Sequence, residues 1–273
     1  MFLAFGLIVI ADREICRFER REWVKKLILI LILIFALWGN AEAAGLEANF
    51  LGKKGTLIEM MIEAQIDNAH ILFSDARLQL YPQILESSAK GTGWEVIFTR
   101  ESIDRGRKCI KENDAILSRV EAQFGVNKEI LVSLFRVETN LGKNIGKYVV
   151  FNSLLTWYVS GNRRASWAAN ELISYLTLCR EHQLDPFEVK GSSHGAFGLL
   201  QFIPSSFQKF AMDGNGDGKI DLFNFEDAMA SSANYLQKQG WGKKEKQKKR
   251  ALHAYNHDWG YVKTVIKYSK LIH

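Results

Sequence analysis

The sequence predicts a mainly α-helical protein. After residue 50, apolar residues recur every three to four positions through most of the chain, and several of these runs end at glycine or asparagine. The chain has only three prolines in 273 residues, so helix breakers are few. The one convincing extended segment is Trp94–Phe98, which follows Gly91 and Gly93. With 47% hydrophobic residues, the chain can bury a substantial core, as one large domain or two modest ones.

The N-terminal region resembles an export signal. Lys25 and Lys26 precede twelve apolar residues, 27–38, and the small residues Ala41 and Ala43 follow. A membrane-spanning helix needs about 20 apolar residues, so we expect a cleaved leader over residues 1–43. We therefore expect the protein to be exported to the periplasm and to contact the membrane only if the leader stays uncleaved. Cys109 and Cys179 are expected to be separate thiols, although an oxidising compartment permits a disulfide.

Helices are expected in order along the chain. The periodicity and stop signals place them at residues 56–66, 71–80, 102–124, 127–141, 165–183, 204–212, 227–239, 244–256 and 259–271. Pro82 ends the second, Gly125 the third, and Asn127 caps the fourth. The basic run 243–250 is interpreted as a solvated helix face rather than a linker.

Glu138 is the strongest candidate for catalysis. Leu134 and Leu131 lie four and seven residues before it, so its side chain shares the apolar face of the predicted helix. Burial disfavours the charged form of a carboxyl group and raises its pKa, which suits a general acid near neutral pH. The alternative is a solvated helical glutamate without a catalytic role.

A glycine-rich segment, 195–205, is a second candidate. Gly195 and Gly198 permit close backbone approach, and the Gln201 amide can donate to and accept from sugar hydroxyls. Phe197 and Phe202 offer aromatic faces for pyranose rings. The alternative is a turn that packs one helix on another.

Residues 213–221 have the spacing of a wrapping calcium loop. Asp213, Asn215, Asp217 and the Lys219 carbonyl occupy alternate ligand positions, with glycine at the sixth. Asn224 stands where a bidentate glutamate closes the usual loop, so closure by Asp227 requires a longer loop. The alternative is an Asp/Gly surface turn.

Near the C-terminus, Tyr255 and Asn256 combine an aromatic ring with an amide, which suits sugar stacking and hydrogen bonding. A packed tyrosine with a capping asparagine is the alternative. The net charge of +6 and pI near 9.1 favour an anionic partner, which could be nucleic acid, an anionic membrane or a carboxylate-bearing wall polymer. No nucleic-acid recognition motif is present, so nucleic acid is not expected as a partner.

These segments, in this order, resemble the lytic murein transglycosylase B family, whose members cleave the peptidoglycan backbone. The resemblance runs from about Phe50 to the C-terminus, through residues 73–77, 136–142, 191–206, 213–227 and 254–256. Two departures stand out. Leu199 and Leu200 replace a tyrosine-glycine pair common in the family, and no cysteine follows the leader for lipid attachment.

The resemblance implies a lysozyme-like catalytic core over residues 101–273, a helical N-terminal extension over 44–100, and an EF-hand-like calcium loop at 213–227. It implies that Glu138 is the sole catalytic acid and base. It also implies that Ser192, Gln201, Tyr255 and Asn256 line the glycan groove, to which the aromatic reading adds Phe202. Asp227 would close a structural Ca²⁺ site.

The expected reaction breaks the β-1,4 bond between N-acetylmuramic acid and N-acetylglucosamine in peptidoglycan and forms a 1,6-anhydro ring. Two alternatives remain at this level. One is a muramidase that hydrolyses the same bond. The other is a calcium-stabilised glycan-binding protein without catalysis.

Overall fold

The structure is a computed structural model that describes residues 44–67, 69–86 and 97–273. The chain divides into two units between Ala48 and Asn49, and the second is compact. The expected leader and residues 94–96 of the expected extended segment lie outside the described residues. In the described chain, no helix has the length and apolar character needed to cross a membrane. The expected boundary near residue 100 stays a prediction.

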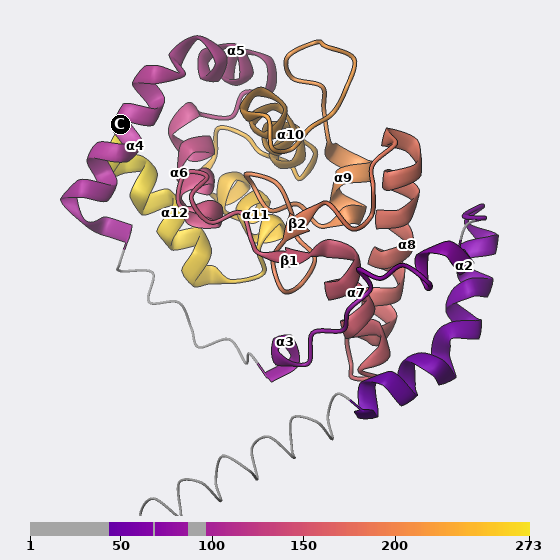
Figure 1. Ribbon diagram of the computed structural model, residues 1–273. Coiled ribbons are helices and arrows are strands. Elements are labelled where there is room, and N and C mark those ends of the chain that lie inside the picture. The colour runs from indigo at the N-terminus through magenta and orange to yellow at the C-terminus, as the bar shows by residue number, and fades with distance from the viewer. Residues whose placement is uncertain (1–43, 68, 87–96) are drawn as a thin grey trace, which may run out of the picture. The chain divides into compact units, whose positions relative to one another are not determined.

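The second unit is mainly helical, as the sequence predicts (Figure 1). Its first described residues, 49–63, are helical. The helices that follow are α2 (Ala69–Leu72), α3 (Gln83–Glu86), α4 (Arg100–Glu112), α5 (Asp114–Phe124), α6 (Lys128–Thr139), α7 (Val150–Val159), α8 (Ala165–His182), α9 (Pro204–Phe210), α10 (Phe225–Lys238), α11 (Glu245–Tyr255) and α12 (Trp259–Ile272). Two short strands, β1 (Tyr148–Val149) and β2 (Lys190–Gly191), pair antiparallel.

Helix α6 lies at the centre of one helical group, in contact with α4, α5, α10 and α12 (Figure 1). Its buried residues surround most of its axis and include Val132, Ser133 and Phe135 besides the expected Ile130, Leu131 and Leu134. The prediction of a single apolar face was therefore incomplete. Neighbouring helices cover α6 on several sides, so even the Ser133 hydroxyl is buried, where it donates to the Glu129 carbonyl at 2.6 Å.

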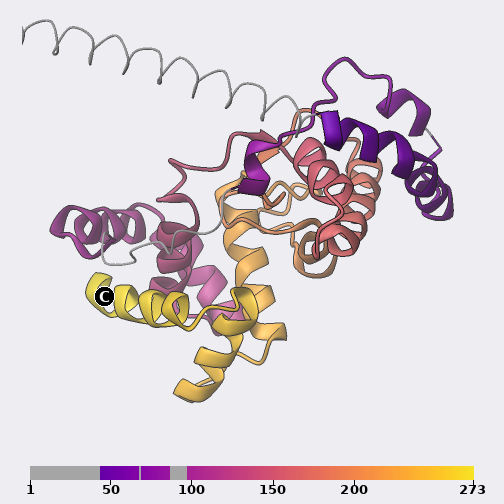
Figure 2. The ribbon, with the colours of Figure 1, turned by 90° about the horizontal axis from the view of Figure 1, so that it is seen from below.

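Helix α7 was missed by the sequence reading. All ten of its residues are buried, so it has no exposed, charged face from which a helical period could be recognised. It packs lengthwise against α8, and the two lie side by side in a view that separates them from α4, α6 and α12 (Figure 2). The strand pair β1–β2 was missed as well, because two-residue strands leave no periodic signal.

Several expected boundaries were wrong. Residues 102–124 form two helices, since the chain breaks at Asn113, whose side chain donates to the Cys109 carbonyl at 2.9 Å. Ile97 and Phe98 form a 3₁₀ turn instead of extended chain, and the helix expected over 71–80 ends at Leu72. Gly125 does end α5, in the left-handed conformation that glycine favours. The two described cysteines, Cys109 and Cys179, are free thiols as expected.

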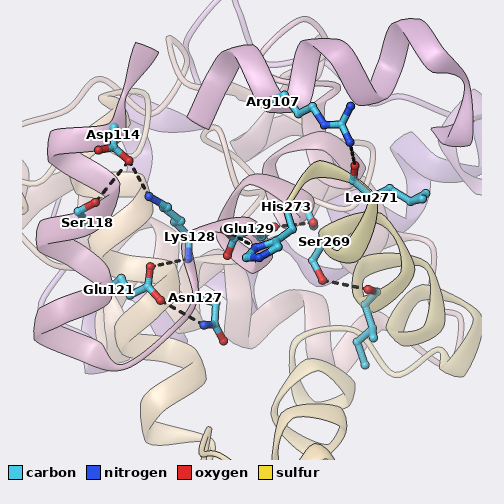
Figure 3. Close-up of polar contacts among 12 residues, drawn as sticks. Arg107, Asp114, Ser118, Glu121, Asn127, Lys128, Glu129, Ser269, Leu271 and His273 are labelled. Atoms are coloured by element: carbon cyan, nitrogen blue, oxygen red, sulfur yellow. Dashed lines mark hydrogen bonds and ion pairs between the residues drawn. The ribbon is translucent and has the colours of Figure 1, made fainter. Parts of the chain in front are cut away.

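Polar contacts fasten α4, α5, α6 and α12 to one another (Figure 3). Asn127, expected to cap α6 with its side chain, instead donates its amide to Glu121 of α5 at 3.1 Å. The other contacts are Lys128 with Asp114 at 2.6 Å, Arg107 with the Leu271 carbonyl at 2.9 Å, and His273 with Glu129 at 3.3 Å. They hold the helix that carries Glu138 and the C-terminal helix in one framework.

Candidate active site

Glu138 lies in the last turn of α6 and is half-buried. The helix ends at Asn140, whose backbone is left-handed and whose carbonyl and side-chain oxygens both accept from Arg105, at 2.9 and 3.1 Å. The Tyr261 hydroxyl donates to Glu138 Oε1 at 2.5 Å. Burial raises the pKa of Glu138 to about 7, and the hydrogen bond from Tyr261 opposes that rise because it stabilises the charged form. The expectation that this carboxyl is desolvated thus agrees with the structure.

Two tyrosines from the C-terminal helices surround the Glu138 carboxyl. Tyr255 ends α11, and Tyr261 lies in the first turn of α12, where it is 1% exposed. Burial, and then the negative charge of Glu138, raise the pKa of both phenols far above its usual value, so both stay neutral hydrogen-bond donors. The direct role of Tyr261 was missed in the sequence. The one local signal was Asp258, which caps α12 and fixes where its first turn begins.

The segment from Gly191 to Phe202 folds back on itself beside β2. Phe197 forms isolated bridges with Gly191 and with Phe202. The Ser192 hydroxyl accepts from the backbone N–H groups of His194 and Ala196, at 3.2 and 3.1 Å. Ser192, expected in the glycan groove, therefore organises this turn. Whether it also contacts glycan stays a prediction.

Like its neighbour Phe202, Gln201 lines a cavity beside this segment. Its φ is +52°, uncommon for a side-chain-bearing residue, and it lines a cavity of about 220 Å³ together with Tyr255. Both hydrogens of its amide are used, since Nε2 donates to the Ile145 carbonyl at 3.2 Å and to the Gly198 carbonyl at 2.9 Å. Gln201 was expected to donate to and accept from sugar. Within the described residues its Oε1 accepts no hydrogen bond, so accepting is the function left to it.

The aromatic faces expected from Phe197 and Phe202 are mostly covered. Each ring is 3% exposed, because each is packed among other aromatic rings. Phe202 contacts the Tyr255 ring edge to face at 5.9 Å. Phe202 also lines the cavity that Gln201 and Tyr255 share, and its expected contact with sugar stays a prediction.

Tyr255 and Asn256 lie where α11 ends. The Tyr255 hydroxyl donates to the Leu200 carbonyl at 2.6 Å, which joins α11 to the Gln201 segment. Asn256 holds the C-cap position, and its side chain makes no hydrogen bond within the described residues. The structure therefore brings Glu138, Tyr255 and Gln201 together through Tyr261 and the Leu200 carbonyl.

The Gln201 segment is attached to both α6 and the acidic loop. The Thr139 hydroxyl, next to Glu138, donates to the Leu199 carbonyl at 2.8 Å, and the Leu199 N–H donates to the Leu222 carbonyl at 2.9 Å. Gly198 lies so close to Leu222 that an added Cβ would meet the Leu222 Cβ at 2.5 Å. Leu222 is therefore in contact with the Gln201 segment, which is in turn bonded to α6.

The acidic loop wraps around its own backbone. Asp213 accepts from Gly216 and Gly218 N–H groups, at 2.6 and 2.8 Å. Asp227, 1% exposed at the start of α10, accepts from the N–H groups of Gly214, Asn215 and Asp221, so it reaches back across the loop as the longer-loop hypothesis requires. Among the described residues, no three acidic, histidine or cysteine side chains converge at metal-binding distance. The donors of the loop are nevertheless all oxygens, the set that Ca²⁺ prefers.

Fold and site together define a helical domain organised around one protonatable carboxyl group. The chain belongs to the family described as the transglycosylase SLT domain, whose model matches residues 77–270. It is 37% identical over 145 residues to membrane-bound lytic murein transglycosylase B of Escherichia coli, a stretch that covers 53% of this chain and 40% of that relative. The match thus spans less than half the length of the relative.

Solved structures share the fold. The lytic transglycosylase SLT35 of Escherichia coli, in complex with calcium, superposes with a TM-score of 0.72 at 23% identity, over 81% of this chain and 92% of that one. SltB3 of Pseudomonas aeruginosa, in complex with NAG-anhNAM-pentapeptide, superposes with a TM-score of 0.73 at 20% identity, over 82% of this chain and 79% of that one. These likenesses agree with the mainly helical, lysozyme-like fold predicted from the sequence.

Proposed function

We propose that this protein is a lytic transglycosylase, which cleaves the MurNAc-β-1,4-GlcNAc bond of peptidoglycan and leaves 1,6-anhydromuramoyl ends. One observation carries the proposal: Glu138 has a pKa of about 7 and receives a hydrogen bond from Tyr261. A carboxyl group with this pKa is populated in both protonation states near neutral pH, so it can serve first as acid and then as base. Family membership supports the same reaction.

In the first step, protonated Glu138 donates its proton to the glycosidic oxygen, and the C1–O bond of the muramoyl residue breaks. In the second, the Glu138 carboxylate takes the proton of the muramoyl 6-hydroxyl while O6 bonds to C1. The proton that left Glu138 is thereby restored, and no water is consumed. The Tyr261 hydroxyl stabilises the carboxylate between the two steps.

The surroundings of Glu138 favour this one-carboxyl scheme over hydrolysis. Glycoside hydrolysis usually needs a second carboxylate as base or nucleophile. Within the described chain, burial and the Tyr261 hydroxyl are what perturb the pKa of Glu138, and no acidic side chain contributes. The groups near Glu138 are instead the neutral phenols of Tyr255 and Tyr261.

We also propose that Ca²⁺ occupies the acidic loop, held by Asp213, Asn215, Asp217, Asp227 and the Lys219 carbonyl. The oxygen donor set and the buried Asp227 carboxylate fit this ion. Calcium would neutralise the loop carboxylates and take no part in the chemistry. The loop would position Gln201 through residues of this chain. The Leu222 carbonyl accepts from the Leu199 N–H, and the Gly198 carbonyl accepts from the Gln201 amide.

The products of peptidoglycan digestion test the proposal. Purified sacculi are treated with the protein and the soluble fragments are identified by mass spectrometry. Anhydromuramoyl ends are expected. Reducing muramoyl ends would show a muramidase, and an absence of fragments would leave a glycan-binding protein.

A variant assigns the catalysis to Glu138. Glu138→Gln is expected to lower turnover by roughly 10²–10⁴-fold, since the amide cannot transfer the proton. Glu101→Gln, an exposed carboxyl on α4, is the matched control and should retain activity. Unchanged turnover in Glu138→Gln would remove Glu138 from the mechanism.

For location, we propose export to the periplasm with removal of the leader near residue 43. N-terminal sequencing of the mature protein checks this, and a mature chain that retains residues 27–38 would show an anchor instead.

A further inference from the structure

Residues 243–250, which lead into α11 and form its first half, carry most of the excess positive charge of the protein. Between residues 243 and 250 there are six basic residues and one acidic residue, while the whole chain has a net charge of +6. A cavity of about 850 Å³ opens beside this stretch. We name it the α11 groove, and its lining is Lys244, Glu245, Lys246, Gln247, Lys249, Arg250, His253 and Trp259.

Two ammonium groups in the α11 groove lack a counter-charge. Lys249 is paired with Glu245 at 2.5 Å. Lys244 and Lys246 are exposed, and no acidic side chain of the described residues lies within ion-pair distance of either. Unpaired lysines that line a concave site concentrate positive potential there, and this potential attracts an anionic group.

The floor of the groove adds an aromatic surface. Trp259 is 54% exposed, and one face of its indole is stacked on the His253 ring, with centroids 4.3 Å apart. The exposed part of the indole can contact an aliphatic segment of a ligand that lies beside the lysines. Such a mixture of indole and ammonium suits a ligand with short apolar side chains and carboxylates, as a peptide has.

The α11 groove adjoins the candidate active site. His253 lines the groove, while His257 lines the 220 Å³ cavity that Gln201 and Tyr255 share. The rings of His253 and His257 are in edge-to-face contact, with centroids 5.4 Å apart. α11 and α12, which form the groove, are also the helices that carry Tyr255 and Tyr261 (Figure 1).

We propose that the α11 groove binds the carboxylates of the peptide substituents on the glycan strand that is cut at Glu138. The inference rests on the proposed function and adds a specificity site to it. A flat anionic membrane is the less favoured occupant, because the charges line a concave surface and Trp259 is the one large apolar side chain of the groove that is more than a third exposed.

Binding is measured in the Glu138→Gln background, so that no ligand is consumed. The probes are a glycan oligomer that keeps its peptides and the same oligomer after an amidase has removed them. The test variant is Lys244→Gln/Lys246→Gln. Affinity for the peptide-bearing oligomer is expected to fall about threefold to tenfold relative to the stripped one, as two exposed ion pairs are lost. Raising the salt concentration should shrink the same preference in the parent protein.

Two further variants separate charge from other effects. Lys108→Gln/Lys111→Gln removes the same charge from the exposed surface of α4 and should keep the parent preference. Lys244→Arg/Lys246→Arg should restore it. Equal preference in the test variant and the parent would overturn the proposal.

A sedimentation assay with vesicles of phosphatidylglycerol and phosphatidylethanolamine covers the membrane alternative. Loss of vesicle binding in Lys244→Gln/Lys246→Gln, with an unchanged peptide preference, would also overturn the proposal and assign the groove to anionic lipid. Failure of the proposed function gives a different result, since the protein with Glu138 intact would then yield no anhydromuramoyl ends from either oligomer.

Discussion

The raised pKa of Glu138 makes a prediction about stability that is separate from catalysis. Folding moves this pKa from 4.5 to about 7, so the folded state holds the proton more tightly than the unfolded state. The stabilisation that this proton provides is fully present below pH 4.5 and is lost as the pH rises through 7. This rise in pKa corresponds to at most about 3.4 kcal/mol, and the partial exposure of the side chain reduces this to roughly 2 kcal/mol. Glutamine carries no proton to lose.

Glu138→Gln should therefore gain about 2 kcal/mol in unfolding free energy over the parent protein between pH 4 and pH 8. Urea denaturation of both proteins at the two pH values measures it, and titrations elsewhere cancel in the comparison. Glu101→Gln should differ from the parent by the same amount at both pH values. If the Glu138→Gln difference is also constant within about 0.5 kcal/mol, the carboxyl is solvated and the argument for its acid role is refuted.

Three other predictions test Tyr261, the acidic loop and the packing of the Gln201 segment. Tyr261→Phe removes the hydrogen bond that lowers the pKa of Glu138, so the alkaline limb of the pH–rate profile should move to higher pH while kcat falls about tenfold to hundredfold; a limb that stays in place would contradict this. Asp227→Asn turns an amide toward three backbone donors and should lower the unfolding free energy by roughly 2–3 kcal/mol. EDTA should lower the Tm of the parent protein but hardly that of this variant, and equal losses would argue against Asp227 as a calcium ligand. Gly198→Ala and Gly216→Ala both strain a left-handed backbone, but a Cβ at 198 also meets Leu222 whereas one at 216 meets nothing. In urea denaturation, Gly198→Ala should lower the unfolding free energy by roughly 1–3 kcal/mol more than Gly216→Ala does. Equal losses would refute close packing at Gly198.

Rules of apolar spacing and helix capping were sufficient to predict a helix where its bounds depend on residues close by in the sequence. The start and end of α8, α10 and α12 follow from apolar spacing, and Gly125 ends α5 because glycine accepts a left-handed backbone. The same rules failed at α7, where burial on all sides removes the period, and at Asn113, where a side chain competes for a helix carbonyl. They also did not reveal that the Phe202 ring packs on Tyr255, because a pattern of aromatic residues does not say which rings meet in space.

The sequence by itself determined the helical class, the position of Glu138 on an apolar stretch of helix and the oxygen-rich loop, since each depends on residues within about twelve positions of one another. Only the tertiary structure decided that Tyr261, 123 residues away, donates to Glu138, that the Gln201 amide is already occupied by the Ile145 and Gly198 carbonyls, and that Leu222 supports the groove. The physical reason is that desolvation and hydrogen bonding depend on which groups surround a side chain in space. Spacing along one helix fixes which face a carboxyl lies on, and the packing of α6 against α12 fixes what it meets there.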